Sequence, residues 1–326
     1  MKRIKRTFPG KYITAAGLPA LIWMSLACVE TPSTTAFDAS LSRTEIDGYA
    51  FHTETHGDPE LPPLVVVHGG PGADFYYLRA LSSLSDEYHV LFYDQRGTGL
   101  SPREAPAGHS IEQFIKDLDD LIQAHAGRRP VRVIGHSWGG MLAIAWASRN
   151  PDRASHIVAA EPGALTPEAW GPFVEQMQSS MSMGKIFQAL PALLTSVFVG
   201  GEDGHAGDDH AMSRIMTLGG DGPPYECEGA ALPADTIRRA GYTSFNSMTG
   251  PYMEDPERWQ FDFTRGLDNY GGELLLFSSE CSFIGQAWQE RYHLPRLPVQ
   301  TRHEVLPNAG HYMYTIRPER ALRITR

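Results

Sequence analysis

The stretch VRVIGHSWGGMLAIAWASRNP, residues 131–151, passes from a short apolar segment through a serine flanked by small residues into a longer apolar segment. Glycines surround Ser137, at positions 135, 139 and 140. Glycines at this spacing indicate a backbone conformation or a close approach that a Cβ atom would obstruct. The pattern therefore predicts a tight turn with Ser137 at its centre.

The segments on either side of Ser137 predict a strand followed by a helix. Val131–Ile134 is short and apolar enough for a buried strand, and the segment from Trp138 to Arg149 has the length of a helix that ends before Asn-Pro. G-x-S-x-G between a strand and a helix is the context in which a sharp turn exposes a nucleophilic serine. The positive end of the new helix would point toward the reacting centre. We therefore predict that Ser137 is a nucleophile.

Outward from this turn, short buried strands alternate with amphipathic helices. Helices are predicted at 75–85 and after Ser110, a plausible N-cap. Residues 45–56 are predicted to form an antiparallel strand at the edge of the sheet. Further strands are predicted at 64–67, 88–93, 156–164, 272–280 and 300–307. The alternation implies parallel βαβ units with helices on both faces of one sheet, which is an α/β fold.

The alternation stops near residue 165 and resumes about a hundred residues later. Residues 165–267 are helix-like and loop-like, and rich in Met, Gly and Pro. We interpret them as a largely helical cap inserted between two strands of one sheet. The core would then comprise residues 45–164 and 268–326, because the sheet needs the strands on both sides of the insertion.

A serine hydroxyl needs a base before it can attack a carbonyl carbon. The segment PNAGHYMY places His311 in a glycine-containing loop after the last predicted strand. His293 and His303 are weaker candidates, because the first lies in a helix-like stretch and the second inside a strand. His311 is therefore the predicted base.

The negative oxygen that develops during such an attack needs hydrogen-bond donors. HGGPG, residues 68–72, follows a buried strand and exposes backbone N–H groups in a glycine-rich turn. The N–H of Gly70 and the N–H of Trp138, directly after the nucleophile, are the predicted pair of donors. His68 is expected to brace this loop by hydrogen bonding.

Four motifs together resemble a known family. HGGPG, DQRGTGLS, GHSWGG and AGH occur in the order and approximate spacing of α/β-hydrolases, and are most similar to the proline iminopeptidase-like serine peptidases, over residues 64–163 and 272–312. The resemblance implies an α/β-hydrolase fold, a Ser-acid-His triad, an acyl-enzyme, and neither a metal nor an organic cofactor. It also implies that Asp94 and Arg96 stabilise the loops around the serine.

The resemblance leaves the substrate open. In that family, cap glutamates bind the free α-amino group of the substrate. Five glutamates of the insertion are candidates for this role, and none of them stands in the family's surrounding pattern: Glu175, Glu202, Glu226, Glu228 and Glu254. The first expectation is the N-terminal residue of a short peptide, proline first. An esterase or lactonase acting on small esters is the alternative, and a non-catalytic binding protein on the same fold is the alternative of a different class.

The acid that orients His311 has two candidates. The family usually places an aspartate after the strand that here reads ELLLFSSE, and Glu280 occupies the end of that strand. Some relatives draw the acid from the preceding sheet strand, where Glu161 follows VAA. Asp262 and Asp268 precede the late strand and lie too early to reach its carboxyl end. Glu280 is the prediction, and Glu161 is its competitor.

The first 28 residues have the layout of an export signal. MKRIKR is basic, and ITAAGLPALIWMSLA is apolar but too short for a confident spanning helix. SLAC resembles a bacterial lipoprotein box, with Ser25 where leucine is preferred and Cys28 as the lipidated residue. We expect a signal at 1–28, a polar tether at 29–44, and an exported protein that is periplasmic or held at the membrane through Cys28. A plain cleaved signal and an uncleaved anchor are the alternatives.

Charge and cysteine content limit the partners. The formal net charge is −10, and removing residues 1–27 deletes five basic residues and moves it to −15. Such a surface repels phosphate backbones, which argues against nucleic-acid binding. The expected partner is a small-molecule or short-peptide substrate. Export would leave Cys227 and Cys281 in an oxidising compartment, where a disulfide is permitted.

Overall fold

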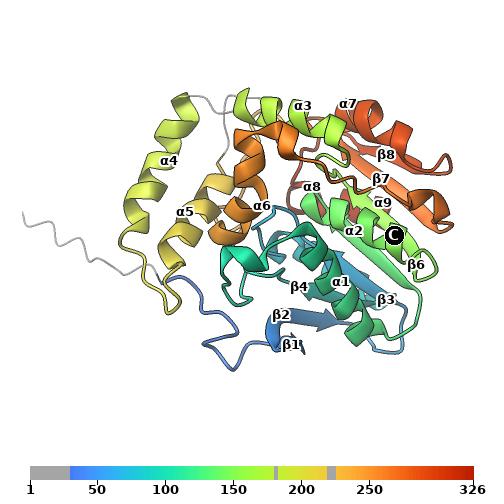
Figure 1. The fold of residues 1–326 in the computed structure, drawn as a ribbon, viewed down its shortest axis with the longest axis horizontal. Helices are drawn as coiled ribbons and strands as arrows, with labels where there is room; N and C mark the ends of the chain where they lie inside the picture. Colours follow the sequence, from blue (N-terminus) through green and yellow to red (C-terminus); the bar gives the residue numbers. More distant parts are fainter. Residues whose placement is uncertain (1–29, 180–182, 219–224) are drawn as a thin grey trace, which may run out of the picture.

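A computed structural model describes residues 30–179, 183–218 and 225–326 (Figure 1). The signal segment expected at 1–28 lies outside these residues. Among the helices of the described ranges, none has the combination of length and apolar character that crossing a membrane requires.

One eight-stranded sheet runs through the protein in the order β1-β2-β4-β3-β5-β6-β7-β8. Its strands are β1 (Arg43–Ile46), β2 (Tyr49–His56), β3 (Pro63–Val67), β4 (His89–Tyr93), β5 (Val131–His136), β6 (Ala154–Ala160), β7 (Glu273–Ser279) and β8 (Arg302–Leu306). The pairings β4–β3, β3–β5, β5–β6, β6–β7 and β7–β8 are all parallel. The two pairings at the other edge, β1–β2 and β2–β4, are antiparallel. The predicted α/β fold with a mostly parallel sheet is confirmed.

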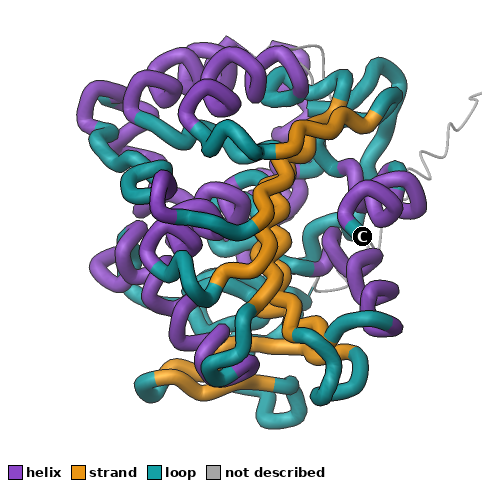
Figure 2. Tube along the Cα trace, turned by 90° about the vertical axis from the view of Figure 1, so that its right-hand side faces the viewer, coloured by secondary structure: helices purple, strands orange, loops and turns teal. Residues whose placement is uncertain are grey.

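Helices cover both faces of the twisted sheet (Figure 2). The α-helices are α1 (Ile111–Ala126), α2 (Trp138–Arg149), α3 (Pro167–Ser179), α4 (Met183–Ser196), α5 (Ala206–Met216), α6 (Tyr242–Glu254), α7 (Gln286–Trp288), α8 (Met313–Ile316) and α9 (Pro318–Thr325). α1 and α2 pack into one apolar core, and the 3₁₀-helix η1 (Tyr76–Asp86), α8 and α9 pack into a second core on the other side. The Ser110 hydroxyl accepts from the N–H of Gln113, so the predicted N-cap of α1 is confirmed.

Two sequence predictions near the start of the sheet need correction. The single edge strand predicted at 45–56 is a hairpin of β1 and β2, because Asp47 and Gly48 adopt positive φ angles of 51° and 79° and reverse the chain. The helix predicted at 75–85 is the 3₁₀-helix η1 (Tyr76–Asp86).

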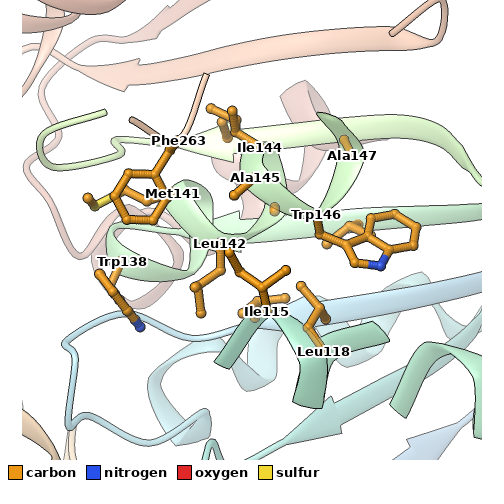
Figure 3. Close-up of a cluster of buried hydrophobic side chains, with 14 of the residues drawn as sticks. Ile115, Leu118, Trp138, Met141, Leu142, Ile144, Ala145, Trp146, Ala147 and Phe263 are labelled. Atoms are coloured by element: carbon orange, nitrogen blue, oxygen red, sulfur yellow. The ribbon is translucent and has the colours of Figure 1, made fainter. Parts of the chain in front are cut away.

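The helix that follows Ser137 is buried almost all round. Leu142 and Trp146 of α2 are fully buried, and Figure 3 shows them facing Ile115 and Leu118 of α1. Full burial of one such aliphatic side chain stabilises a protein by about 1.5–3 kcal/mol. This packing fixes the first turn of α2, and with it the position of Ser137.

The chain between β6 and β7 contains α3, α4, α5 and α6, the cap helices. A buried ion-pair cluster holds them to the core. Nε of Arg103 lies 2.8 Å from Oδ2 of Asp209 in α5, and Nη2 of Arg239 lies 3.1 Å from the same oxygen. Buried charges need such partners, because an unpaired one would remain desolvated. The cluster therefore fixes the cap helices over the loops at the carboxyl ends of the strands.

Candidate active site

Ser137 lies at the sharp turn between β5 and α2. Its φ angle is 55°, a conformation that residues other than glycine rarely adopt. Its N–H donates to the Ala160 carbonyl oxygen over 2.8 Å, which ties the turn to the end of β6. A Cβ on Gly135 would collide with the Gly139 carbonyl oxygen, and one on Gly139 would collide with the Val67 carbonyl oxygen. The flanking glycines are therefore required by close backbone contacts around Ser137.

The turn at 68–72 lies against Ser137. A Cβ built on Gly69 would lie 2.9 Å from the Ser137 Cβ. The N–H of Gly69 donates to the Tyr77 hydroxyl over 2.7 Å. Within the described residues, the N–H groups of Gly70 and Trp138 donate to no protein atom. Trp138 opens α2, where the first N–H groups have no partner within the helix. The two predicted oxyanion donors therefore have no acceptor among the described residues.

His68 braces this turn. Its Nε2 accepts from the N–H of Gln95 over 3.0 Å, and its carbonyl oxygen accepts from the Gln95 side chain over 2.7 Å. The Gln95 Oε1 atom accepts from the Trp138 indole over 3.1 Å. Burial lowers the pKa of His68, which keeps the ring neutral and its Nε2 able to accept.

Asp94 and Arg96 also hold loops together. The Asp94 carboxylate lies 2.7 Å from His52 Nδ1 and accepts from the N–H of Leu100 over 2.7 Å. Arg96 binds both carboxylate oxygens of Asp117 over 2.8 Å. These contacts agree with the stabilising role that the resemblance implies.

His311 and Glu161 form a buried pair. Nδ1 of His311 donates to Oε2 of Glu161 over 2.7 Å, and the two side chains are 7% and 0% exposed. The other oxygen of Glu161 accepts from the Ser279 N–H over 2.6 Å and from the Ser279 hydroxyl. Because both oxygens are bound, the carboxylate has a fixed orientation, and it fixes the His311 ring in turn.

The predicted acid, Glu280, is in the wrong place. It is exposed, and its carboxylate accepts from the N–H of Asn308 over 2.7 Å. Successive side chains of a strand point to opposite faces. Ser279, the last residue of β7, contacts Glu161, and the next residue therefore points away from His311. The alternative, Glu161, is the residue that contacts His311, the predicted base.

A hydrogen-bonded chain links the two loops that flank Ser137, and sequence reasoning did not find it. The Tyr77 hydroxyl accepts from Gly69 and donates to His136 Nδ1 over 2.7 Å. His136 Nε2 donates to the His311 carbonyl oxygen over 2.8 Å. Burial, together with the charge of His311, holds the pKa of His136 well below its usual range, so His136 stays neutral and can act as both donor and acceptor.

A cap segment contacts the His311 loop from the other side. The Tyr225 carbonyl oxygen accepts from the N–H of His311 over 2.5 Å, and Glu226 Oε1 accepts from the N–H of Tyr312 over 2.6 Å. Glu226 Oε2 is buried and has no hydrogen-bond partner among the described residues. Burial raises the pKa of Glu226. An unpartnered buried carboxylate oxygen is costly unless a ligand completes it.

A disulfide ties this segment to the core. Cys227 is bonded to Cys281, which lies just after β7 and whose N–H donates to the Ala309 carbonyl oxygen over 3.0 Å. Both ends of the bridge therefore adjoin the loop that contains His311.

Replacing Cys227 and Cys281 together by serine should lower kcat at least about fivefold, because the Tyr225 carbonyl would no longer be held against the His311 N–H. The unfolding free energy should fall by about 4 kcal/mol, as expected for a loop of this length. Steady-state kinetics and urea unfolding would measure the two effects, and non-reducing mass spectrometry would establish the bridge in the wild type. Unchanged kcat in the double variant would show that the bridge does not position His311.

Among the described residues, no cluster of three or more His, Cys, Asp or Glu side chains is placed to hold an ion.

Known proteins share this architecture. The model of the alpha/beta hydrolase fold family matches residues 62–318. A proline iminopeptidase of Lactobacillus helveticus is 39% identical over 102 residues, which is 30% of this chain and 34% of that protein. Epoxide hydrolase 3 of Xenopus tropicalis is 26% identical over 87% of this chain and 76% of its own length. Two further relatives are matched over only 41% and 37% of their own length: a putative carbamate hydrolase RutD of Stutzerimonas stutzeri and a cis-3-alkyl-4-alkyloxetan-2-one decarboxylase of Shewanella oneidensis.

Solved structures agree with the family match. The proline iminopeptidase of Mycobacterium smegmatis superimposes with a TM-score of 0.62 at 20% identity, over 88% of this chain and 97% of that one. At this identity the likeness concerns the fold alone. The family match, which spans most of the chain, leads to one conclusion: this chain belongs to the alpha/beta hydrolase fold family, and part of it resembles the proline iminopeptidases.

Proposed function

We propose that the protein is a serine hydrolase that works through an acyl-enzyme, with Ser137 as nucleophile, His311 as base and Glu161 as the orienting acid. The observation that carries this proposal is the buried hydrogen bond between His311 and Glu161. Ser137, Glu161 and His311 follow β5, β6 and β8, so all three lie at the carboxyl edge of one parallel sheet. The nucleophile, acid and base occur in the chain order of this fold.

The reaction follows from these roles. The Ser137 oxygen attacks the acyl carbon while His311 Nε2 takes its proton, and Glu161 stabilises the imidazolium that forms. The N–H groups of Gly70 and Trp138 bind the resulting oxyanion. His311 then gives the proton to the leaving group, which departs and leaves an ester on Ser137. Water, deprotonated by His311, hydrolyses that ester and restores the enzyme.

The substrate we propose is the N-terminal residue of a short peptide, proline first. Glu226 supports this choice, because its carboxylate borders the His311 loop and has one buried oxygen without a partner. A charged donor forms a stronger hydrogen bond with a carboxylate than a neutral donor does. A substrate ammonium group would therefore satisfy the oxygen that the protein leaves unbound. The proline iminopeptidases among the relatives agree with this substrate class.

Glu226→Gln should raise KM for prolyl-, alanyl- and leucyl-arylamides by at least about tenfold, which corresponds to the loss of one charge-assisted hydrogen bond. Its effect on p-nitrophenyl esters, which carry no ammonium group, should be small. The glutamine retains a carbonyl oxygen for the Tyr312 N–H, so the loop contact survives. Glu228→Gln is the matched control, because Glu228 is exposed two residues away.

The pH dependence supplies a second readout. Because burial raises the pKa of Glu226, the carboxylate is present only above that raised value. Arylamide binding should weaken as the pH falls through it, and ester hydrolysis by the same protein should lack this step. Fast ester hydrolysis, slow arylamide hydrolysis and no effect of Glu226→Gln would favour the esterase or lactonase instead.

A further inference from the structure

The outer face of α4 and of the turn after it is apolar and exposed. We call it the α4 face; its residues are Phe187, Leu190, Leu193, Leu194, Val197 and Phe198. Their exposure runs from 41% for Leu190 to 76% for Val197. From Ile186 to Gly201 the sequence contains no charged residue. The solvent face of a helix in a globular protein is normally polar or charged, and a contiguous apolar face of this kind marks an interaction surface.

The position of α4 in the fold leaves this face open. Figure 1 shows α4 at the edge of the protein farthest from β8, with α5 on its inner side. α4 packs against α5, and Ala192, which is 8% exposed, lies on the buried side of the helix. Positions 187, 190 and 194 share one side of α4 because they are three or four residues apart, and Val197 and Phe198 follow directly in the turn after the helix. The apolar residues therefore form one strip along α4 and this turn.

The N-terminal part of the chain enters the fold at one end of this strip. Glu30 forms a β-bridge with Gly200, and the N–H of Thr31 donates to the Gly200 carbonyl oxygen over 3.4 Å. The Ser33 hydroxyl donates to Glu202 over 2.8 Å. Gly200 follows Phe198 by two residues. The first described residues of the chain therefore lie directly beside the α4 face.

We propose that the α4 face docks on a phospholipid bilayer, in the headgroup region, beside the point where the N-terminal segment joins the fold. The chain before Glu30 contains the apolar run at 13–27 and Cys28, from which the sequence predicts membrane attachment. Attachment through Cys28 alone would hold the fold near the membrane without fixing which of its faces meets the lipid, and a second, apolar contact would fix that orientation. The α4 face supplies that contact, and its position at the anchored end of the fold is what selects a bilayer as the partner.

The charge distribution sets the character of the contact. The α4 face has no charge, and the chain as a whole is acidic, so attraction to anionic lipids does not drive docking. Docking instead removes apolar side chains from water, and its strength should depend little on salt. The weak salt dependence would distinguish docking through the α4 face from the adsorption of a basic protein surface to an anionic membrane, because salt weakens such adsorption.

The test uses the full-length protein and vesicles of phosphatidylcholine with one part in five phosphatidylglycerol, in a sedimentation assay. The triple variant Phe187→Ser, Leu194→Ser and Phe198→Ser should bind at least about tenfold more weakly than the wild type at both low and high salt. Its melting temperature and its hydrolysis of a soluble substrate should be unchanged, because these side chains are exposed and distant in sequence from the proposed triad. Val299→Ser, at a fully exposed apolar residue outside the α4 face, is the control and should bind like the wild type.

Hydrogen–deuterium exchange locates the contact. Vesicles should slow exchange of the amides from 187 to 200 in the wild type and leave α1 unaffected. Vesicle binding that is equal in the triple variant and the wild type would overturn the proposal. The proposal would also fail if, without vesicles, the wild type were a dimer and the triple variant a monomer. A second copy of the protein would then cover the α4 face. Protection of 187–200 without vesicles that is lost on deleting residues 1–27 would overturn it in favour of the chain's own N-terminal segment.

Discussion

Ser137→Ala is expected to abolish turnover and leave the fold intact. Nucleophile and base act as a unit, so removing the hydroxyl should lower kcat by about 10⁴-fold or more. The Ser137 side chain makes no capping hydrogen bond to α2, and alanine tolerates the positive φ no worse than serine. The measurement is kcat on the fastest arylamide or ester, with circular dichroism and thermal unfolding to verify the fold.

An active-site probe supplies the matching chemical readout. A fluorophosphonate should label Ser137 in the wild type, and peptide mapping should find no other labelled serine. The alanine variant should remain unlabelled at the same probe concentration. Wild-type turnover in Ser137→Ala, or labelling at another position, would contradict the proposed mechanism as a whole.

Glu161→Gln is expected to cost about 10³–10⁴-fold in kcat, with KM changed far less. Both carboxylate oxygens accept hydrogen bonds, one from His311 Nδ1 and the other from Ser279. An amide has only one accepting oxygen, and its other end is an NH₂ group. That NH₂ group would face either the His311 Nδ1–H or the Ser279 N–H, and the hydrogen bond at that end would be lost. The His311 ring would then lose its orientation or the tautomer that leaves Nε2 free to take a proton.

Glu280→Gln is the matched control. Glu280 is exposed, and an amide oxygen can accept the Asn308 N–H as the carboxylate does. Its kcat should remain within about twofold of the wild-type value, as for most surface substitutions. A collapse of kcat in Glu280→Gln together with near wild-type activity in Glu161→Gln would return the role of the acid to Glu280.

Much of the site could be predicted because its signals are local. The strand, turn and helix around Ser137 occupy consecutive residues, and the glycines required by the turn are its neighbours in the sequence. His311 could be placed because it follows the last strand in a short loop. The alternation of buried strands and amphipathic helices was enough for the fold class, since periodicity is a property of each segment taken alone.

The identity of the acid could not be decided in this way. Glu161 and Glu280 follow adjacent parallel strands, and both could reach the same edge of the sheet. Only the direction in which each side chain leaves its strand separates them. That direction depends on how β6, β7 and the loop before His311 are aligned in three dimensions, and a motif match carries no information on it.

The remaining contacts join residues far apart in the chain. His136 contacts the loop of His311, and Glu226 binds Tyr312 across the boundary between cap and core. No local pattern distinguishes Glu226 from the other cap glutamates, because its burial depends on its contact with the distant His311 loop. The sequence by itself determined the fold class and pointed to Ser137 and His311 as the proposed nucleophile and base, through short-range periodicity and turn chemistry. The tertiary structure decided which carboxylate contacts His311, the cap contacts and the exposed face of α4, because each depends on which distant surfaces meet and which stay uncovered.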